Sequence, residues 1–286
     1  MHKYTLENLH FDTTNKWEPS FQQVFNHSSD NPFSLTFTLP SQLDRIKKIF
    51  LKSVELPVGF TNIRSENNSN TLTISINSVV CTIAIPSAQY NINTLLSTIN
   101  DAFVSSGIYS GSNSNLLPIF TLSGQKIKIT VPNAPYSIAT IEFTSKTILS
   151  TVILGFSYNY QIIGSNTITS PNNYNIAYDT YLSVQLPYVN HKSTSATNQQ
   201  ISFKIPYNGY ANSIFYSVEN TQFSQYVETN ESNCVLGNLK IVVVDRYSFP
   251  INNNGLDWSF TLGFQRDLTP HHYTHQEQQL YIPENY

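Results

Sequence analysis

The side chains with the composition of a metal site lie close together near the C-terminus: His271, His272, His275 and Glu277. Zinc needs three or four ligands held at fixed geometry by a folded scaffold and supported by a second shell of hydrogen bonds. These residues follow Pro270 in a polar stretch with no helical pattern to set two ligands on one face. The sequence therefore predicts a solvated tail, or a strap on a neighbouring subunit, with no metal and no cofactor.

Two carboxylates, Asp245 and Asp257, flank a turn-rich connector that includes Pro250, Asn254 and Gly255. Carboxylates brought close together can perform acid–base chemistry. Aspartates beside a tight turn also accept hydrogen bonds from turn N–H groups, and this second use is the expected one here. The sequence lacks a glycine-rich phosphate loop after a strand, G-x-S-x-G and H-E-x-x-H. We expect no enzymatic activity.

The elements that position these aspartates are two strands. An apolar run at 239–244 leads into Asp245-Arg246, and a second run at 257–264 begins with Asp257-Trp258. Runs of this kind, joined by a Pro/Asn/Gly connector, predict a β-hairpin. We interpret it as the closing hairpin of a β-sandwich.

Six further strands are predicted from alternating or β-branched runs, with Pro40 and Pro57 ending the first two. Eight strands are the number in a jelly roll, so the predicted fold class is mainly all-β, an eight-stranded jelly-roll β-sandwich. Two successive β domains divided near residue 160 remain an alternative. The predicted strands are 33–39, 46–56, 179–186, 200–205, 213–218, 223–228, 239–246 and 257–264.

Between the early strands, residues 58–156 follow a different pattern. A strand pair at 71–76 and 79–85 precedes a stretch, 91–106, whose apolar residues recur at helical spacing before Gly107. This predicts a small α+β insertion. The predicted division is an N-terminal arm at 1–31, a jelly roll at 32–57 and 177–266, an insertion at 58–176, and a C-terminal tail at 267–286.

The predicted arm carries three aromatic residues spaced by four, Trp17, Phe21 and Phe25. They are candidate anchors on a neighbouring subunit. Cys81 and Cys234 stand among apolar or strand-forming neighbours without metal-type spacing, which predicts buried free thiols in a reducing compartment.

The charge content excludes other classes. Only 12% of residues are charged and the net charge is −3, so the chain has little field with which to bind a polyanion, and no specific nucleic acid is expected. The basic residues at 45–52 are expected to be solvated edge charges. No signal peptide is evident at the N-terminus, and no run approaches the roughly 20 apolar residues of a transmembrane segment.

Several stretches resemble known proteins. Residues 245–262 read D-R-Y…P-I-N-N-N-G-L-D-W-S-F-T-L, residues 49–57 read I-F-L-K-S-V-E-L-P, and residues 83–100 and 153–156 contain I-A-I-P-S-A-Q-Y-N-I-N-T-L-L-S-T-I-N and I-L-G-F. These stretches resemble minor capsid and penton proteins of large double-stranded DNA viruses, virophages and polinton-like viruses. The chain departs from this pattern at Tyr247-Ser248-Phe249, where such proteins often have glycine-containing turns.

The resemblance implies a structural virion protein of the jelly-roll capsid lineage. The expected role is a penton subunit at five-fold vertices, and the alternative is a minor capsid or cement protein that braces major-capsid capsomers. The implied partners are copies of itself in a homopentamer, the major capsid protein and other minor capsid proteins, and the implied location is the virion, assembled in the host cytoplasm or a viral factory. The candidate assembly and turn residues are Asp245, Arg246, Asn254, Gly255, Asp257 and Trp258.

A hypothesis of a different class is a glycan-binding attachment domain. It predicts exposed aromatic side chains clustered with amide partners on one loop face. The assembly hypothesis predicts closed symmetry instead.

Overall fold

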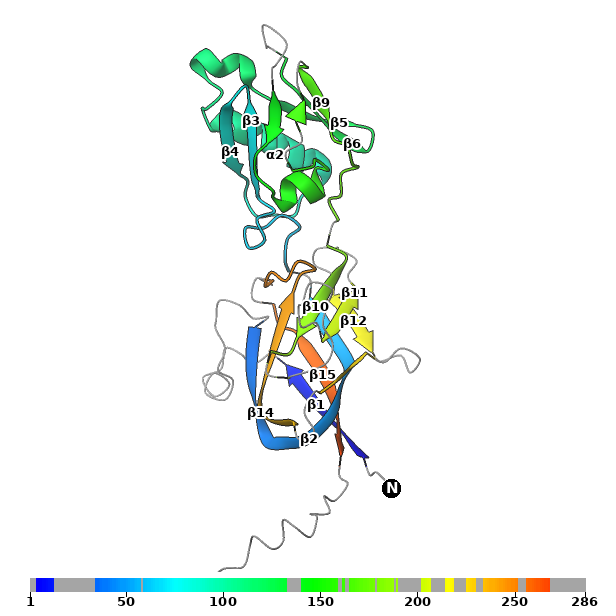
Figure 1. Ribbon diagram of the computed structural model, residues 1–286. Coiled ribbons are helices and arrows are strands. Elements are labelled where there is room, and N and C mark those ends of the chain that lie inside the picture. The colour runs from blue at the N-terminus through cyan, green and yellow to red at the C-terminus, as the bar shows by residue number, and fades with distance from the viewer. Residues whose placement is uncertain are drawn as a thin grey trace, which may run out of the picture.

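The structure, a computed structural model, describes thirteen stretches of the chain. They are residues 4–12, 34–57, 59–132, 140–158, 161–162, 165–177, 179–187, 189, 202–206, 214–218, 225–229, 234–251 and 256–267. The described residues form two units, a β-sandwich and an α+β unit mounted at one end of it (Figure 1). Each unit has its own cluster of buried apolar side chains.

The sandwich is a single antiparallel sheet folded over its own core. Its strand order is β1-β15-β2-β14-β10-β11, and β12 and β13 also pair with β2. The eight strands are β1 (Tyr4–Asp12), β2 (Ser34–Pro57), β10 (Tyr181–Gln185), β11 (Phe203–Pro206), β12 (Ile214–Val218), β13 (Tyr226–Glu228), β14 (Cys234–Val244) and β15 (Ser259–Asp267).

The long strand β2 carries the sheet from one face of the sandwich to the other. Its first part pairs with β14 up to Ile46, and its second part pairs with β15, β12 and β13. At the bend, Arg45 takes a positive φ of 52°, and the register with β14 shifts twice. Bulges of this kind let a strand turn sharply without losing its pairing, and the bend is visible at the foot of the sandwich in Figure 1.

Counting the two halves of β2 separately, and β12 with β13 as one position, the sandwich has eight strand positions. This is the composition of a jelly roll, so the predicted fold class is confirmed. The number of strand positions agrees with the predicted eight, but the strands that fill them differ from the predicted ones. The structure adds β1, while the two strands predicted at 213–218 and 223–228 lie end to end along β2 and fill one position.

Three expectations about this unit were wrong. Residues 4–12 of the predicted arm form β1, because their alternation lets Leu9 and Phe11 pack on the core while pairing with β15. The strand does not stop at Pro40, since it continues through the bend. Two tandem domains divided near residue 160 are excluded, because β2 pairs with strands that come after residue 210.

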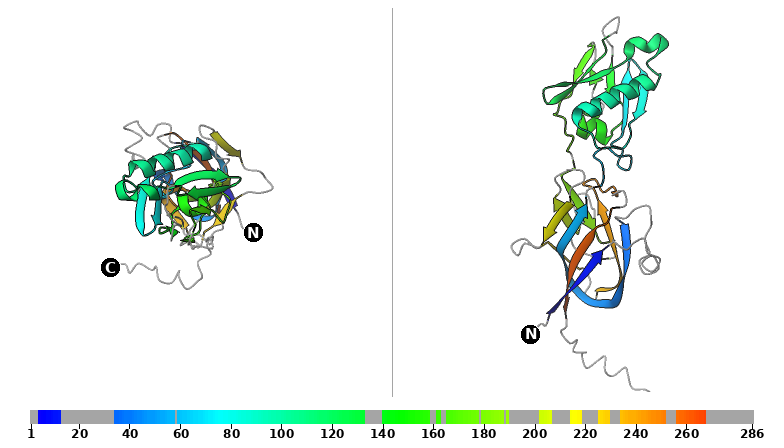
Figure 2. Two further views of the ribbon diagram at one scale, coloured as in Figure 1. Left: turned by 90° about the horizontal axis from the view of Figure 1, so that it is seen from above. Right: turned by 180° about the vertical axis from the view of Figure 1, so that it is seen from behind.

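The insertion unit contains two small antiparallel sheets, β4-β3-β7-β8 and β5-β6-β9, and one long helix. Figure 2 shows helix and sheets together above the sandwich. Its elements are β3 (Thr71–Ile76), β4 (Val79–Ala84), α2 (Ile92–Ser105), η1 (Gly111–Leu116), β5 (Ile119–Ser123), β6 (Lys126–Thr130), β7 (Ile141–Phe143), η2 (Leu149–Ile153), β8 (Gln161–Ile162) and β9 (Thr167–Thr169).

Helix α2 confirms the helix predicted at 91–106. Asn91 caps its N-terminus: the Asn91 side chain accepts from the Thr94 N–H at 3.0 Å, and the Thr94 hydroxyl accepts from the Asn91 N–H at 3.1 Å. The buried face carries Leu95, Leu96, Ile99 and Phe103. The helix therefore folds against the two sheets by its apolar stripe.

Both cysteines are buried free thiols, as predicted. The core of the sandwich includes Trp258, whose ring lies 5.9 Å from the Phe37 ring and 4.8 Å from the Phe260 ring, both edge to face.

Candidate functional site at the junction of the two units

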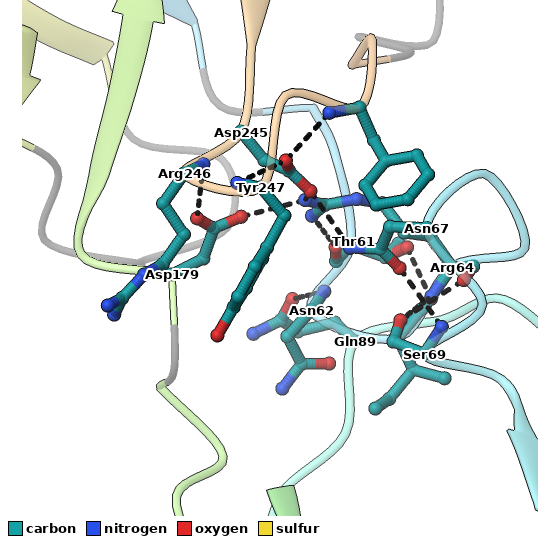
Figure 3. A network of polar contacts seen from close by, with 12 residues as sticks. Thr61, Asn62, Arg64, Asn67, Ser69, Gln89, Asp179, Asp245, Arg246 and Tyr247 are labelled. Carbon is teal, nitrogen blue, oxygen red and sulfur yellow. Dashed lines mark hydrogen bonds and ion pairs between the residues drawn. The ribbon is translucent and has the colours of Figure 1, made fainter. Parts of the chain in front are cut away.

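Two stretches of chain cross between the units, and both pass beside the end of β14. Residues 59–70 lie between β2 and β3, and residues 170–177, 179 and 180 lie between β9 and β10. β14 stops at Val244, and the chain continues as Asp245-Arg246-Tyr247. Figure 3 shows polar side chains from all three segments converging on one another.

Arg64, within residues 59–70, supplies the cation at the centre of these polar contacts. Its Nη2 donates to Asp179 Oδ2 and to Asp245 Oδ2, each at 2.7 Å. Its Nη1 donates to the carbonyl of Thr61 at 3.1 Å. The side chains of Arg64, Asp179 and Asp245 are 4%, 7% and 0% exposed. A single buried guanidinium therefore connects both chain crossings to the end of β14.

Asp245 accepts hydrogen bonds on both carboxylate oxygens. Oδ1 accepts from the backbone N–H groups of Tyr247 at 2.8 Å and Phe249 at 2.9 Å. Oδ2 accepts from Arg64 and from Asn67 Nδ2, the latter at 3.0 Å. Four donors satisfy this buried carboxylate. The same residue therefore closes the turn after β14 and binds the insertion unit.

The turn after Arg64 brings Asn67 to Asp245. The Arg64 N–H donates to Ser69 Oγ at 2.8 Å, and the Ser69 N–H donates to Asn67 Oδ1 at 3.0 Å. Asn67 is 1% exposed. We refer to Arg64, Asn67, Asp179 and Asp245 as the junction network.

Burial sets the electrostatics of the junction network. It raises the pKa of Asp179 above its ordinary value, and the hydrogen bond and charge of Arg64 oppose that rise, while the nearby Asp245 carboxylate adds to it. Two carboxylates share one guanidinium in a site where no side chain is more than 7% exposed. Such an arrangement fixes the geometry of chain segments, because losing one member leaves the others buried without compensation.

The two residues after Asp245 also contribute to the junction. Tyr247 packs against the apolar core of the insertion unit. Arg246 is exposed, and its guanidinium lies 5.7 Å from the Tyr181 ring and 5.4 Å from the Tyr247 ring. The Lys204 ammonium lies over the same Tyr181 ring, 4.0 Å from its centre.

The other predicted site residues are placed as follows. Asp257 is half-buried just before β15, and the carboxylate that shares Arg64 with Asp245 is Asp179 rather than Asp257. Trp258 is 2% exposed in the sandwich core, so a role in contacts between subunits was a wrong expectation. Five candidates lie outside the described residues: Trp17, Phe21, Phe25, Asn254 and Gly255.

Sequence reasoning missed Arg64 and Asp179. A signal for Arg64 was present, because it is the only arginine between residues 58 and 176 and stands in a segment with few charges. Asp179 has no comparable signal. Its partner lies 115 residues away in the chain, and only the fold brings the two together.

The structure describes no group of three or more His, Cys, Asp or Glu side chains able to hold a metal ion, and the C-terminal histidines are outside the described residues. No helix in the described part of the chain is long and apolar enough to cross a membrane.

The exposed aromatic residues in the described part do not form the loop-face cluster that the glycan hypothesis predicts. Tyr158 is 52% exposed on the insertion unit, whereas Tyr226 is 48% exposed on the sandwich. Tyr226 pairs with Phe50 at 5.6 Å on a sheet face, and Lys48 lies 4.4 Å over its ring. The ring is thus engaged within the sheet itself.

Comparisons with known proteins find matches among solved structures. No family model matches the chain, and no curated protein matches it. Among solved structures, the crystal structure of the selenomethionine-labelled mavirus penton protein matches with 12% sequence identity and a TM-score of 0.43, covering 93% of this chain and 100% of that chain. A likeness at this TM-score does not bear on function.

Proposed function

We propose that this chain is a structural subunit of an icosahedral virion, and that it closes five-fold vertices as a penton protein. Its partners would be further copies of itself, the major capsid protein and other minor capsid proteins. It would act by assembly and not as an enzyme.

One observation carries the proposal. The D-R-Y stretch, through which the sequence resembles capsid and penton proteins, is the part of the jelly roll that holds the insertion unit. Asp245 binds Arg64 and Asn67, and Tyr247 packs on the insertion core. A jelly roll that holds a second unit firmly at one end can present that unit in one direction, while its sides remain available to neighbouring subunits.

The test is the solution mass of the purified full-length chain by light scattering, followed by negative-stain class averages. A mass of five copies with five-fold averages is the expected result. A single-copy mass at every concentration, unchanged when the major capsid protein is added in stoichiometric amounts, would overturn the proposal. A single-copy chain that binds between major-capsid capsomers would instead indicate the bracing role.

A further inference from the structure

The strand order of the sandwich ends in β11 on one side and β1 on the other, and the two edges differ in how their backbone groups are covered. At one end, β11 is closed by a side chain: Gln225 Oε1 accepts from the Lys204 N–H, and Gln225 Nε2 donates to the Lys204 carbonyl, both at 2.8 Å. The Leu51 N–H donates to the Gln225 carbonyl at 3.1 Å. Gln225 thus takes the place of a neighbouring strand at this edge.

At the other end, β1 lacks most of the usual forms of edge protection. Proteins block exposed edges with lysine, proline, bulges or short strands. β1 reads YTLENLHFD, without lysine or proline, and it pairs with β15 over nine residues without a register shift. Among the described residues it pairs only with β15. Leu6 on its outer face is 55% exposed. β1 carries two acidic residues, Glu7 and Asp12, and the Glu7 carboxylate pairs with Arg266 of β15 at 3.3 Å. A long, regular edge with few charges is a template for another strand.

We propose that the edge of β1 binds residues 268–286 of a second copy of this chain, which add as a strand to the sandwich. This inference rests on the proposed function, because it names the contact through which copies assemble.

The position of the chain end supports this occupant. The described chain ends at Asp267, which pairs with Tyr4 at the start of β1. The tail therefore leaves the sandwich directly beside the open edge. Residues 268–277 form a polar stretch that can span at most about 33–36 Å. That reach is about the length of β1, roughly 30 Å for nine residues.

The sequence of the tail fits the edge. Residues 278–282 read Gln-Gln-Leu-Tyr-Ile, with Pro283 after them. In a strand, Leu280 and Ile282 share one face, and that face continues the core side of β1, where Leu9 and Phe11 lie. Tyr281 then lies on the outer face.

The direction of the strands favours a second copy over the same copy. β1 and β15 are antiparallel, so a tail that turns back directly from Asp267 over the same β1 would run parallel to it. To pair antiparallel with its own β1, the tail would first have to stretch residues 268–277 almost fully along the strand. A tail arriving from a neighbouring copy can enter at the other end of β1 and pair antiparallel, which is the more stable arrangement.

The experiment uses pairs of full-length cysteine variants. One chain carries Tyr281→Cys, and the other carries Leu6→Cys, Asn8→Cys or His10→Cys, which sample the outer face of β1 at three registers. The native thiols are buried. The control partner is Val104→Cys on α2, which is 63% exposed. After mixing and mild oxidation, a disulfide-linked pair of chains is expected for at least one β1 position and not for the control.

A second variant tests pairing by backbone hydrogen bonds. Tyr281→Pro removes a donor from the added strand, so assembly should weaken by about tenfold. No crosslink at any of the three positions, an equal crosslink to the Val104→Cys control, or unchanged assembly of Tyr281→Pro would each overturn the inference. Five-fold rings without the crosslink would overturn this inference alone, whereas single copies that stay single even with the major capsid protein added would overturn the proposed function.

Discussion

Replacing Arg64 with methionine tests whether the junction network holds the two units together. Methionine keeps much of the side-chain volume but removes the guanidinium, which donates to Asp179, Asp245 and the Thr61 carbonyl. Both carboxylates are nearly inaccessible to solvent. Breaking a buried ion pair by removing one partner costs about 3–5 kcal/mol, and we expect a loss of unfolding free energy in that range at neutral pH.

The assay is chemical denaturation followed by hydrogen exchange, because a protein of two units need not unfold in one step. The Tyr247 and Phe249 amides donate hydrogen bonds to Asp245. Exchange at these two amides should be faster in the variant than in wild type. Lowering the pH should reduce the difference between Arg64→Met and wild type, because protonation removes the charges left without a partner.

The matched control is the triple variant Arg64→Met, Asp179→Asn, Asp245→Asn. It removes all three charges together, so it should recover a large part of the stability lost in the single variant. A loss below about 1 kcal/mol for Arg64→Met, the range of exposed ion pairs, would refute the reasoning. A triple variant no more stable than the single variant would also contradict it.

Three further predictions concern single residues. Gly155→Ala should lower the thermal unfolding midpoint sharply, because Gly155 has a φ of +78° and an added Cβ would lie 2.5 Å from the Asn172 carbonyl oxygen; a midpoint within a degree of wild type would contradict this. Gln225→Ala should cost about 0.5–1.5 kcal/mol and speed exchange of the Lys204 amide, because that exposed amide exchanges its side-chain acceptor for water; unchanged exchange would contradict the edge closure. Burial raises the pKa of Asp179, so the folded chain holds this proton more tightly than the unfolded chain. Stability relative to Asp179→Asn should therefore fall as pH rises from the ordinary aspartate value through the raised one, and denaturation midpoints that rise instead would refute the sign.

The sequence predicted the elements of this fold better than their connections. Period-two alternation and β-branched runs located most of the sandwich strands, and helical spacing located α2. The bend of β2 was not predictable, because Pro40 ordinarily ends a strand, and the register shifts that carry the strand past it depend on β14, distant in sequence. β1 was missed because a single exposed edge strand with polar alternation resembles an arm until its partner is known.

The same limit applies to the junction. Asp245 was identified from its place after a buried strand, where an aspartate is expected to accept turn hydrogen bonds. Its second function depends on Arg64, 181 residues earlier, and no local pattern encodes that separation. A buried cation can be anticipated where an isolated arginine stands in a segment of low charge, but its partners follow only from the topology.

The junction network and the β1 edge have different roles in an assembling subunit: the first orients the insertion unit within one chain, and the second binds a neighbouring copy. The buried charges are used at the junction network, inside one chain, where low exposure strengthens their interaction and penalises any other orientation of the insertion unit. The β1 edge offers backbone groups and few charges to a neighbour, so contacts there depend little on ionic strength. Salt should therefore leave contacts between copies largely intact, and Arg64 variants should form copies that associate while their insertion units take variable orientations.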